Sequence, residues 1–425
     1  MKIAIAIPTY NSIEKLRVLL ENNYRLFIDR DCDFYIYDSS DTDATREYIA
    51  NNAYEKLVYR RYDPEVTSNE KVYEIYEQLS CEYDYIWMNR DATWFEEELI
   101  DKVLEVINGD RPNILYISPS DGYYDKKFFS DAKNYSLCTN VGLAFYGATI
   151  INSNMLYGVN WSYYKKKYLY SNSAYFSHVG FFVEQMARLD ELKGIILEYP
   201  STKRHLIKNR SLWYPETVKV WGCSWVSLCD ELGQVFRDDS DYVERMINSA
   251  DNRFLEEQLI IYRALEWFDY EKYETYREYL SRVSDVCIER MKEISLMSKD
   301  EAYSICVGKI KAVIKDSTKD YKHIIIYGAG FRGKHIGKIF DAVNVGFDAY
   351  MVTNRTEKIA SDGHKIVRLG DYELGDDTGI VLGVGKENKT DVLNLLEKRN
   401  YLSRICYGME QIDFRYAFLF EDDTK

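Results

Sequence analysis

Residues 1–11 read MKIAIAIPTYN, an apolar run that ends at a proline and opens into polar residues. Residues 12–23 then carry apolar side chains at helical spacing, and Asn11 or Ser12 is placed to cap the first turn. A second apolar run follows at residues 34–37. Strand, helix and strand in this order predict the start of an α/β domain.

Two further apolar runs, at residues 85–88 and 114–118, continue the alternation of strands and helices. We therefore expect an α/β domain with a mostly parallel sheet over residues 1–215. The character changes in residues 216–318, where apolar side chains recur at helical spacing and predict a helical subdomain. The residues that carry this spacing are Leu255, Leu259, Tyr262, Leu265, Tyr303, Val307, Ile310 and Ile314.

Composition limits the classes of protein to consider. The chain has 425 residues, enough for two or three domains, and its 46% hydrophobic and 29% charged residues are typical of a globular protein. The net charge of −14 argues against a nucleic-acid-binding surface. Eight cysteines without a CxxC pair indicate reduced thiols.

Neither a secretory signal nor a membrane helix is expected. The apolar run at residues 3–7 is too short for a signal peptide, and no run approaches the roughly 20 apolar residues of a membrane span. We expect a cytoplasmic protein. Peripheral association with the inner face of the membrane stays open, as does a homo-oligomer.

Polar residues follow the first two predicted strands. Residues 8–11 read PTYN, and residues 38–45 read DSSDTDAT. Small polar groups and a carboxylate at the carboxyl edge of a parallel sheet can bind a nucleobase and ribose. Taken singly, each segment is also compatible with an ordinary polar turn.

This order of features resembles the start of family 2 glycosyltransferases with the GT-A fold. In that family the first strand ends in P-x-Y-N and the second in D-D-G-S-x-D. Asp38 and Asp43 match the first and last acids of the second motif, while Ser39 and Ser40 replace the residues after the first acid. The resemblance covers about residues 1–215. It implies that Asp38 recognises the nucleobase and that further contacts to the nucleotide-sugar donor come from Pro8, Thr9, Tyr10, Asn11 and Asp43.

Asn89-Arg90-Asp91 follows the strand at residues 85–88, where the family carries its D-x-D metal motif. The resemblance implies that Asp91 binds Mn²⁺ or Mg²⁺, which neutralises charge on the leaving diphosphate. Asn89 departs from the motif and offers only a neutral carbonyl as a ligand and donor contact. The site can instead rely on Arg90, and Asp91 can also be read as the cap of a helix starting near Trp94.

Inverting sugar transfer needs a general base. Glu184 stands where the family's E-D motif opens a helix, and we expect it to be that base. His178 is the second candidate, because its ordinary pKa is near neutrality. The alternatives are a solvated helix carboxylate and a structural histidine.

Basic residues cluster after residue 202. Lys203, Arg204, His205, Lys208 and Arg210 can close over the donor diphosphate, or they can form a solvated face. We expect Arg204 and Arg210 to contact the donor and His205 to join the metal ligands. A further patch, YYKKKY at residues 163–168, is either an exposed helix or a contact for an anionic acceptor or membrane.

A second α/β opening lies in the last hundred residues. An apolar run at 323–327 leads into Gly328-Ala329-Gly330-Phe331-Arg332-Gly333, a GxGxxG pattern. The next apolar run, 347–352, ends in Thr353-Asn354-Arg355 without the acid that binds ribose in NAD sites. Residues 319–425 resemble the small Rossmann-like domains of bacterial sugar-modifying enzymes, on IYGAG at 326–330 and the Asp362-Gly363 turn. We expect a structural, acceptor-binding or oligomerisation role.

The leading hypothesis is a glycosyltransferase of the hexosyltransferase type. It moves a sugar from a nucleotide donor, expected to be a UDP-sugar, to a glycan or glycoprotein acceptor with inversion, in bacterial cell-surface glycan synthesis. Two alternatives stay open. One is a noncatalytic nucleotide-sugar-binding protein, and the other is an oxidoreductase centred on Gly328, Gly330 and Gly333.

Overall fold

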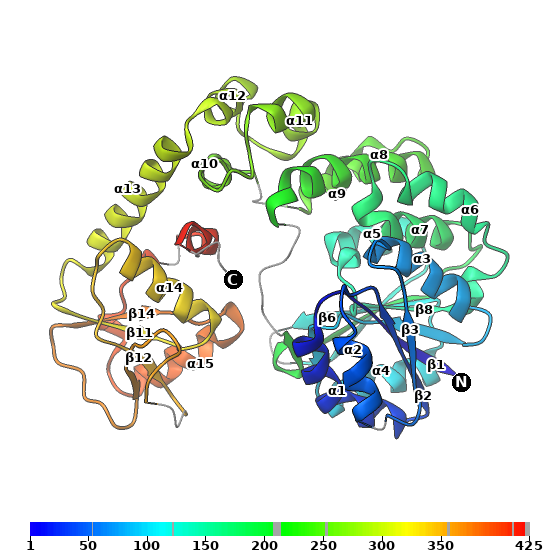
Figure 1. Ribbon diagram of the computed structural model, residues 1–425, viewed down its shortest axis with the longest axis horizontal. Coiled ribbons are helices and arrows are strands. Elements are labelled where there is room, and N and C mark those ends of the chain that lie inside the picture. Colours follow the sequence, from blue (N-terminus) through cyan, green and yellow to red (C-terminus); the bar gives the residue numbers. More distant parts are fainter. Residues whose placement is uncertain are drawn as a thin grey trace. The chain divides into compact units, whose positions relative to one another are not determined.

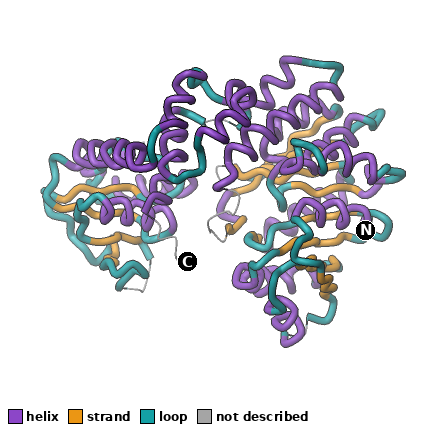
Figure 2. Tube along the Cα trace, turned by 45° about the horizontal axis from the view of Figure 1, so that its top comes forward, coloured by secondary structure: helices purple, strands orange, loops and turns teal. Residues whose placement is uncertain are grey.

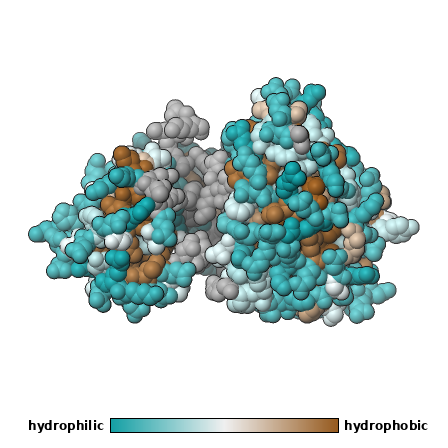
Figure 3. Space-filling view, turned by 90° about the horizontal axis from the view of Figure 1, so that it is seen from below, coloured by the Kyte–Doolittle hydropathy of each residue, from teal (hydrophilic) through white to brown (hydrophobic). Residues whose placement is uncertain are grey.

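A computed structural model describes residues 1–52, 54–120, 123–206, 214–250, 254–354, 358–409 and 412–420. The chain forms two compact units (Figure 1). The first unit comprises Met1–Asn252 with Glu278–Val283, and the second comprises Arg253–Arg277 with Ser284–Lys425. Hydrophilic residues cover most of the face shown in Figure 3, interrupted by small apolar patches. Within the described ranges, no helix is long and apolar enough to cross a membrane.

The first unit is built on a sheet of eight strands among the described residues, in the order β3-β2-β1-β4-β8-β6-β9-β7. Figure 2 shows strands in orange and helices in purple. The strands are β1 (Ile3–Thr9), β2 (Cys32–Asp38), β3 (Leu57–Arg61), β4 (Tyr85–Met88), β6 (Ile114–Ser120), β7 (Asp125–Phe129), β8 (Thr149–Asn152) and β9 (Gly194–Pro200). All four predicted strands of this unit are present.

The sheet is mixed. Strands β3, β2, β1 and β4 are parallel neighbours, but β8 pairs in antiparallel orientation with both β4 and β6, and β7 pairs likewise with β9. The expected parallel arrangement therefore describes the half of the sheet nearest the N-terminus. The α/β class is confirmed.

Helices cover both faces of the sheet in the first unit. They are α1 (Ile13–Ile28), α2 (Ala44–Asn51), α3 (Ser68–Leu79), α4 (Glu97–Asp110), α5 (Ala132–Thr139), α6 (Trp161–Tyr164), α7 (Ser177–Ala187), α8 (Trp225–Val235) and α9 (Ser240–Asn248). A small antiparallel ribbon joins β5 (Thr93–Phe95) to β10 (Arg204–Leu206).

The alternation of side chains in β1 explains how the central strand packs. Ile3, Ile5 and Ile7 are buried in one core with apolar residues of α1 and α4. The small Ala4 and Ala6 point to the other face, because successive side chains of a strand alternate, and they leave room for α3 to pack on β1. Helix α1 starts after Ser12, whose side chain makes no capping hydrogen bond.

The middle of the chain is helical, as expected, with α10 (Glu256–Ala264), α11 (Tyr270–Val283), α12 (Ile288–Leu296) and α13 (Lys299–Thr318) following α9. The two units divide this region between them, so its separation as a domain of its own stays a prediction. The expected apolar stripe of α13 is shifted by one residue in its first half. Tyr303 is 38% exposed, and the buried residues are Ala302, Cys306, Ile310 and Ile314.

The second unit contains the predicted second, smaller sheet. Its four described strands are all parallel, in the order β13-β12-β11-β14. They are β11 (His323–Tyr327), β12 (Ala349–Val352), β13 (Ile366–Arg368) and β14 (Thr378–Leu382), with helices α14 (Phe331–Ala342) and α15 (Lys386–Glu397). The assignment of this unit to the Rossmann-like domains stays a prediction.

Close packing accounts for two of the three glycines in the GxGxxG pattern. Gly328 has φ of +113°, a conformation that favours glycine. A Cβ on Gly333 would lie 1.8 Å from the carbonyl oxygen of Gly328, so the first turn of α14 can pack on the strand end only without a side chain there. A Cβ on Gly330 would meet open space. The first and third glycines take these same roles in dinucleotide-binding turns, so the structural role of this unit stays a prediction.

Candidate functional site

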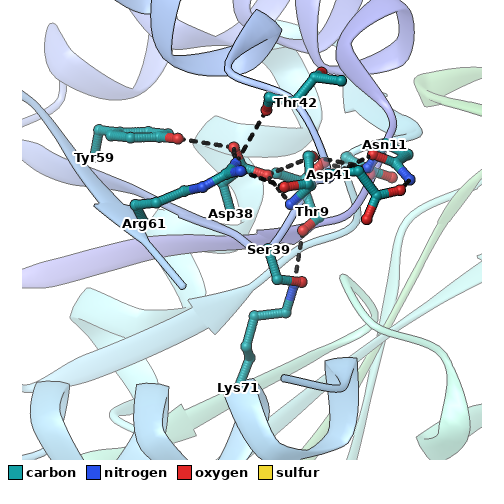
Figure 4. A network of polar contacts seen from close by, with 11 residues as sticks. Thr9, Asn11, Asp38, Ser39, Asp41, Thr42, Tyr59, Arg61 and Lys71 are labelled. Carbon is teal, nitrogen blue, oxygen red and sulfur yellow. Dashed lines mark hydrogen bonds and ion pairs between the residues drawn. The ribbon is translucent and has the colours of Figure 1, made fainter. Parts of the chain in front are cut away.

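Three adjacent parallel strands, β2, β1 and β4, bring their carboxyl ends together. Thr9 ends β1, Asp38 ends β2, and Asp91 follows β4. The Oγ1 of Thr9 donates a 2.8 Å hydrogen bond to Asp91. Figure 4 shows the polar network that surrounds Thr9 and Asp38 at this edge. The three segments that the sequence singled out thus form one cluster, which we call the strand-end cluster.

Asp38 is completely buried, and its carboxylate accepts four hydrogen bonds (Figure 4). The Ser40 amide and hydroxyl donate at 2.9 and 2.5 Å, the Tyr59 hydroxyl at 2.8 Å and Arg61 Nη1 at 2.9 Å. Arg61 also donates to the carbonyls of Ser40 and Thr42. A carboxylate has about four acceptor sites, so Asp38 is satisfied within the protein. It fixes the turn after β2, and a nucleobase would have to displace one of its donors.

Asn11 and Asp41 tie the turn after β1 to the turn after β2. The Asn11 amide group donates to Asp41 at 2.6 Å, and the Asp41 backbone N–H donates back to Asn11 Oδ1 at 3.0 Å. Asn11 has φ of +47°, and Tyr10, 37% exposed, donates its hydroxyl to Asp41 at 3.3 Å. Pro8 is buried within β1. Asp43 is exposed at the start of α2 and makes no capping hydrogen bond.

Lys71 is a site residue that the sequence reasoning missed. It lies fully buried on α3, and its Nζ donates to the Thr9 carbonyl at 2.6 Å and to Ser39 Oγ at 2.8 Å. Burial lowers the pKa of Lys71 to about 8, although the charges of Asp38 and Asp91 oppose this shift. One feature of the sequence could have indicated that Lys71 is buried. It lies four residues before the apolar Ile75, so both are on the same face of α3.

Arg90 adds positive charge next to Asp91, and Arg204 lies near Arg90. Burial lowers the pKa of Arg90, and the neighbouring charge of Arg204 lowers it further. Burial raises the pKa of Asp91, against hydrogen bonds from Thr9 and Ser12 and the charges of Lys15 and Arg90. Cations that crowd each other in a partly dry site favour an anionic ligand.

Asp91 does not cap a helix. Residues 93–95 form strand β5, and α4 begins at Glu97 with Glu96 as its N-cap residue. The helix expected near Trp94 therefore starts three residues later, which leaves the Asp91 carboxylate to Thr9 and the neighbouring cations.

Asn89 points into the core. It is completely buried, and its amide nitrogen donates to the Thr93 carbonyl at 3.1 Å. Its Oδ1 has no hydrogen-bond partner among the described residues. A Cβ on Gly147 would lie 2.2 Å from this oxygen. To bind a donor or a metal ion, Asn89 would have to turn out of this packing.

A metal ion would depend on Asp91. Across the described ranges, no group of three or more His, Cys, Asp and Glu side chains is arranged to hold one. Hard divalent cations are coordinated by oxygen ligands, which carboxylates, phosphates and water can supply to the same ion. Asp91 fits such a shared site as one protein ligand, with the remaining ligands supplied by a bound diphosphate and water.

His205 has other partners. It lies on β10, its ring stacks on Trp94 with centroids 3.8 Å apart and planes at 15°, and its Nε2 lies 2.8 Å from Glu96 Oε1. It joins β10 to the start of α4. Arg204, its neighbour, lies over the ring of Phe95. Lys208 and Arg210 lie outside the described residues.

Glu184 lies in the third turn of α7, because the helix begins at Ser177 and not at the expected motif. Its buried carboxylate accepts hydrogen bonds from Lys167 (2.6 Å), Tyr168 (2.8 Å), Arg188 (2.9 Å) and Tyr164 (3.3 Å). Burial acts to raise the pKa of Glu184, but the hydrogen bonds and charges of these partners outweigh it and lower the pKa. An acceptor hydroxyl must replace one donor before Glu184 can act as a base.

The YYKKKY patch is part of this arrangement. Residues 161–164 form α6, and Lys165–Leu169 form a turn of π-helix. Lys165 pairs with Glu77 and Lys167 with Glu184, so two of the three lysines are neutralised within the unit. Lys166 is exposed.

His178 is buried at the start of α7, between the rings of Tyr146 and Phe182. Within the described part of the chain, neither ring nitrogen makes a hydrogen bond of normal geometry. Burial lowers the pKa of His178 to about 4, with weak opposition from the backbone at Ala144 and Leu143. The imidazole is therefore neutral at pH 7.

We expect His178 to make the first unit less stable in mild acid. The unfolded chain takes up the proton near pH 6.5 and the folded chain only near pH 4, so the contribution is complete above pH 6.5 and is lost as pH falls through this window. Between pH 7.5 and 5 the loss amounts to roughly 2 kcal/mol. Urea unfolding of wild type and His178→Phe at both pH values measures it.

The comparison with His178→Phe separates the effect of His178 on pH-dependent stability from that of Glu231, which has the opposite sign. Burial raises the pKa of Glu231 to about 7, and this carboxyl therefore adds stability as pH falls from 7 toward its unfolded value near 4.5. Glu231 is present in both proteins and cancels in the difference. An equal pH dependence of the two proteins would contradict the assignment.

Comparisons with known proteins find only distant similarity. No protein-family model and no curated protein matches the chain. Among solved structures, it is similar to residues 1–349 of S. aureus TarS in complex with UDP, with 12% identity, a TM-score of 0.40, and coverage of 69% of this chain and 90% of that one. It is also similar to the mannosyltransferase PcManGT from Pyrobaculum calidifontis with GDP-Man and Mn²⁺ (11%, 0.39, 66% and 85%). Glucosyl-3-phosphoglycerate synthase from Mycobacterium tuberculosis with Mn²⁺ and UDP is a third match (13%, 0.34, 55% and 79%). These matches are too distant to assign the chain to a family.

Proposed function

We propose that the chain is a glycosyltransferase that takes a sugar from a nucleotide-sugar donor bound at the strand-end cluster. One observation carries the proposal: Lys71 and Arg90 accompany Asp91 at the carboxyl ends of β1 and β4, and Arg204 of β10 lies near Arg90. Ligands of parallel α/β sheets bind at this edge. A nucleoside diphosphate would supply negative charge to balance these cations.

The residues take separate roles in this proposal. Arg90 and Arg204 bind the diphosphate in this proposal. The fully buried Lys71 holds Thr9 and Ser39 in place and adds its positive charge from inside the unit. Asp91 shares a divalent cation, Mn²⁺ or Mg²⁺, with the diphosphate. When bound, such a cation neutralises charge that develops on the leaving group. Tyr10 and Asn11 form the exposed rim next to the base and ribose.

For the chemistry, we propose a UDP-sugar donor, a glycan or glycoprotein acceptor, and inversion at the anomeric carbon with Glu184 as the base. Arg188 is the donor to Glu184 most easily replaced by an acceptor hydroxyl, because its side chain is 54% exposed. The buried partners Tyr164 and Tyr168 would then hold the carboxylate in place.

A noncatalytic nucleotide-sugar-binding protein is the second candidate. Glu184 with four donors and His178 with its low pKa are both poor proton acceptors in the arrangement described. One measurement, the release of UDP from a UDP-sugar, distinguishes the transferase from the binding protein. A transferase releases UDP from a UDP-sugar in the presence of Mn²⁺, slowly to water and faster with an acceptor glycan, whereas a binding protein returns the donor intact.

Asp91→Asn tests the donor site. We expect the affinity for UDP with Mn²⁺ to fall at least tenfold, about 1.4 kcal/mol, because the neutral amide binds the cation poorly. Without metal the two proteins should bind UDP more equally. Isothermal titration calorimetry with UDP, GDP and CMP, each with and without Mn²⁺, measures both effects and ranks the nucleotides.

The control for this test is Asp300→Asn, which removes the same charge from an exposed position in the second unit. It should leave UDP affinity unchanged. If Asp91→Asn binds UDP and Mn²⁺ as tightly as this control, the strand-end cluster is not the metal-dependent donor site.

A further inference from the structure

Among the described residues of the second unit, helix α13 packs with one of its faces and exposes the other. Ala302, Cys306, Ile310 and Ile314 are buried, and α13 packs closely on α10. The opposite face of α13 is exposed from residue 301 to residue 315, two helical turns on each side of Gly308. This outer face consists of Glu301, Ser304, Ile305, Gly308, Ala312 and Lys315.

Apolar and small residues occupy the middle of the outer face. Ile305 is 41% exposed, and Gly308 and Ala312 are exposed one and two turns later. A glycine inside an exposed helix weakens the helix relative to alanine. Among the described residues, nothing lies within 4 Å of a Cβ built on Gly308, so the described part of the second unit gives no reason for the glycine. A glycine at that point allows another helix to approach the backbone closely.

The charges of the outer face are arranged symmetrically about Gly308. Glu301 stands seven residues before it and Lys315 seven residues after it, so each lies about 10 Å along the axis, on the same face. In the part of the chain that the structure describes, neither side chain makes an ion pair. Asp300 adds negative charge beside Glu301, and Lys311 adds positive charge one turn before Lys315. The neighbouring Lys299 and Asp316 carry opposite signs, but they pair with Glu266 and Lys319.

We propose that the outer face of α13 binds the same face of a second copy of this chain, in an antiparallel pair related by a two-fold axis at Gly308. In that arrangement Glu301 of each copy lies opposite Lys315 of the other, and Ser304 lies opposite Ala312. The same surface serves both copies, as a two-fold interface requires. Antiparallel helix dipoles and two ion pairs favour this orientation over the parallel one, which would place like charges together.

This interface goes beyond the proposed function, since it lies in the second unit and uses no residue of the strand-end cluster. It also gives the second unit a role that needs no nucleotide.

Charge reversal tests the pairing directly. We expect the wild-type chain to be a dimer at micromolar concentration in sedimentation equilibrium. Glu301→Lys and Lys315→Glu should each weaken dimerisation at least tenfold, because each places like charges opposite one another. The double variant, Glu301→Lys with Lys315→Glu, should restore it, since the pairs are re-formed with their signs exchanged. Lys398→Glu, an exposed reversal elsewhere in the second unit, is the control and should not change dimerisation.

A cysteine on the axis supplies an independent measurement. Gly308→Cys should form a disulfide-linked dimer under mild oxidation, because a residue on a two-fold axis lies next to its own copy. Wild type, with its own exposed Cys81, Cys138 and Cys287, is the reference. A wild-type monomer at all concentrations overturns the proposal, and so does a dimer that all three charge variants leave unchanged. A cross-link from position 308 to the first unit of the same chain would mean that the chain itself covers this face, which also overturns it.

Discussion

Asp38→Ala should lower the free energy of unfolding of the first unit by roughly 3 kcal/mol, the lower end of the cost of breaking a buried ion pair. The carboxylate is fully buried and accepts from Ser40, Tyr59 and Arg61, so its removal leaves these donors without an acceptor. The lower end applies because the Arg61 side chain is 30% exposed and can regain water. Nucleotide affinity should also fall, as the turn after β2 loses its anchor.

Urea unfolding followed by tryptophan fluorescence measures this effect. Asp41→Ala is the matched control, since Asp41 is an exposed carboxylate in the same turn with partners Tyr10 and Asn11. It should cost no more than about 1 kcal/mol. If Asp38→Ala is as stable as this control but binds UDP poorly, Asp38 acts as a nucleobase contact and not as an anchor.

Glu184→Gln should depress turnover by about a hundredfold to ten-thousandfold, with little change in donor affinity, if Glu184 takes the acceptor proton. Glutamine keeps the shape but is a far weaker base. The same substitution removes a negative charge from the centre of Lys167, Tyr168 and Arg188, so stability must be measured beside activity.

The two roles of Glu184 separate in kinetics on the folded fraction. A base predicts loss of kcat with normal unfolding. A purely structural anchor predicts loss of stability with kcat retained. Glu191→Gln, an exposed carboxylate just beyond α7, is the control for the charge change. Normal turnover in well-folded Glu184→Gln would remove it as the base and make His178→Gln the next variant to assay.

Local sequence patterns predicted the N-terminal half of the first sheet well. The apolar runs at β1, β2 and β4 are fully buried strands, and period-two alternation in β1 separates large from small side chains. The clustering of Thr9, Asp38 and Asp91 was also predictable, because the carboxyl ends of adjacent parallel strands must meet at one edge.

The partners of these residues were not predictable. Lys71 reaches Thr9 across 62 residues of sequence, and His205 meets Glu96 across 109. Asp38 was expected to face a ligand, yet Arg61 and Tyr59 of β3 enclose it. Periodicity identifies which face of a helix or strand is apolar. It does not predict which distant donor will form a hydrogen bond with a given acceptor.

The sequence by itself determined the strands β1, β2, β4 and β6, the helix α1 and the edge of the sheet where polar groups collect, because backbone geometry and side-chain alternation act over a few residues. Only the folded structure decides that Asp38 is enclosed, that Asn89 faces Gly147 and that Glu184 is surrounded by four donors. The physical reason is that a buried polar atom must find a partner in space, and that partner is set by the packing of elements far apart in the sequence.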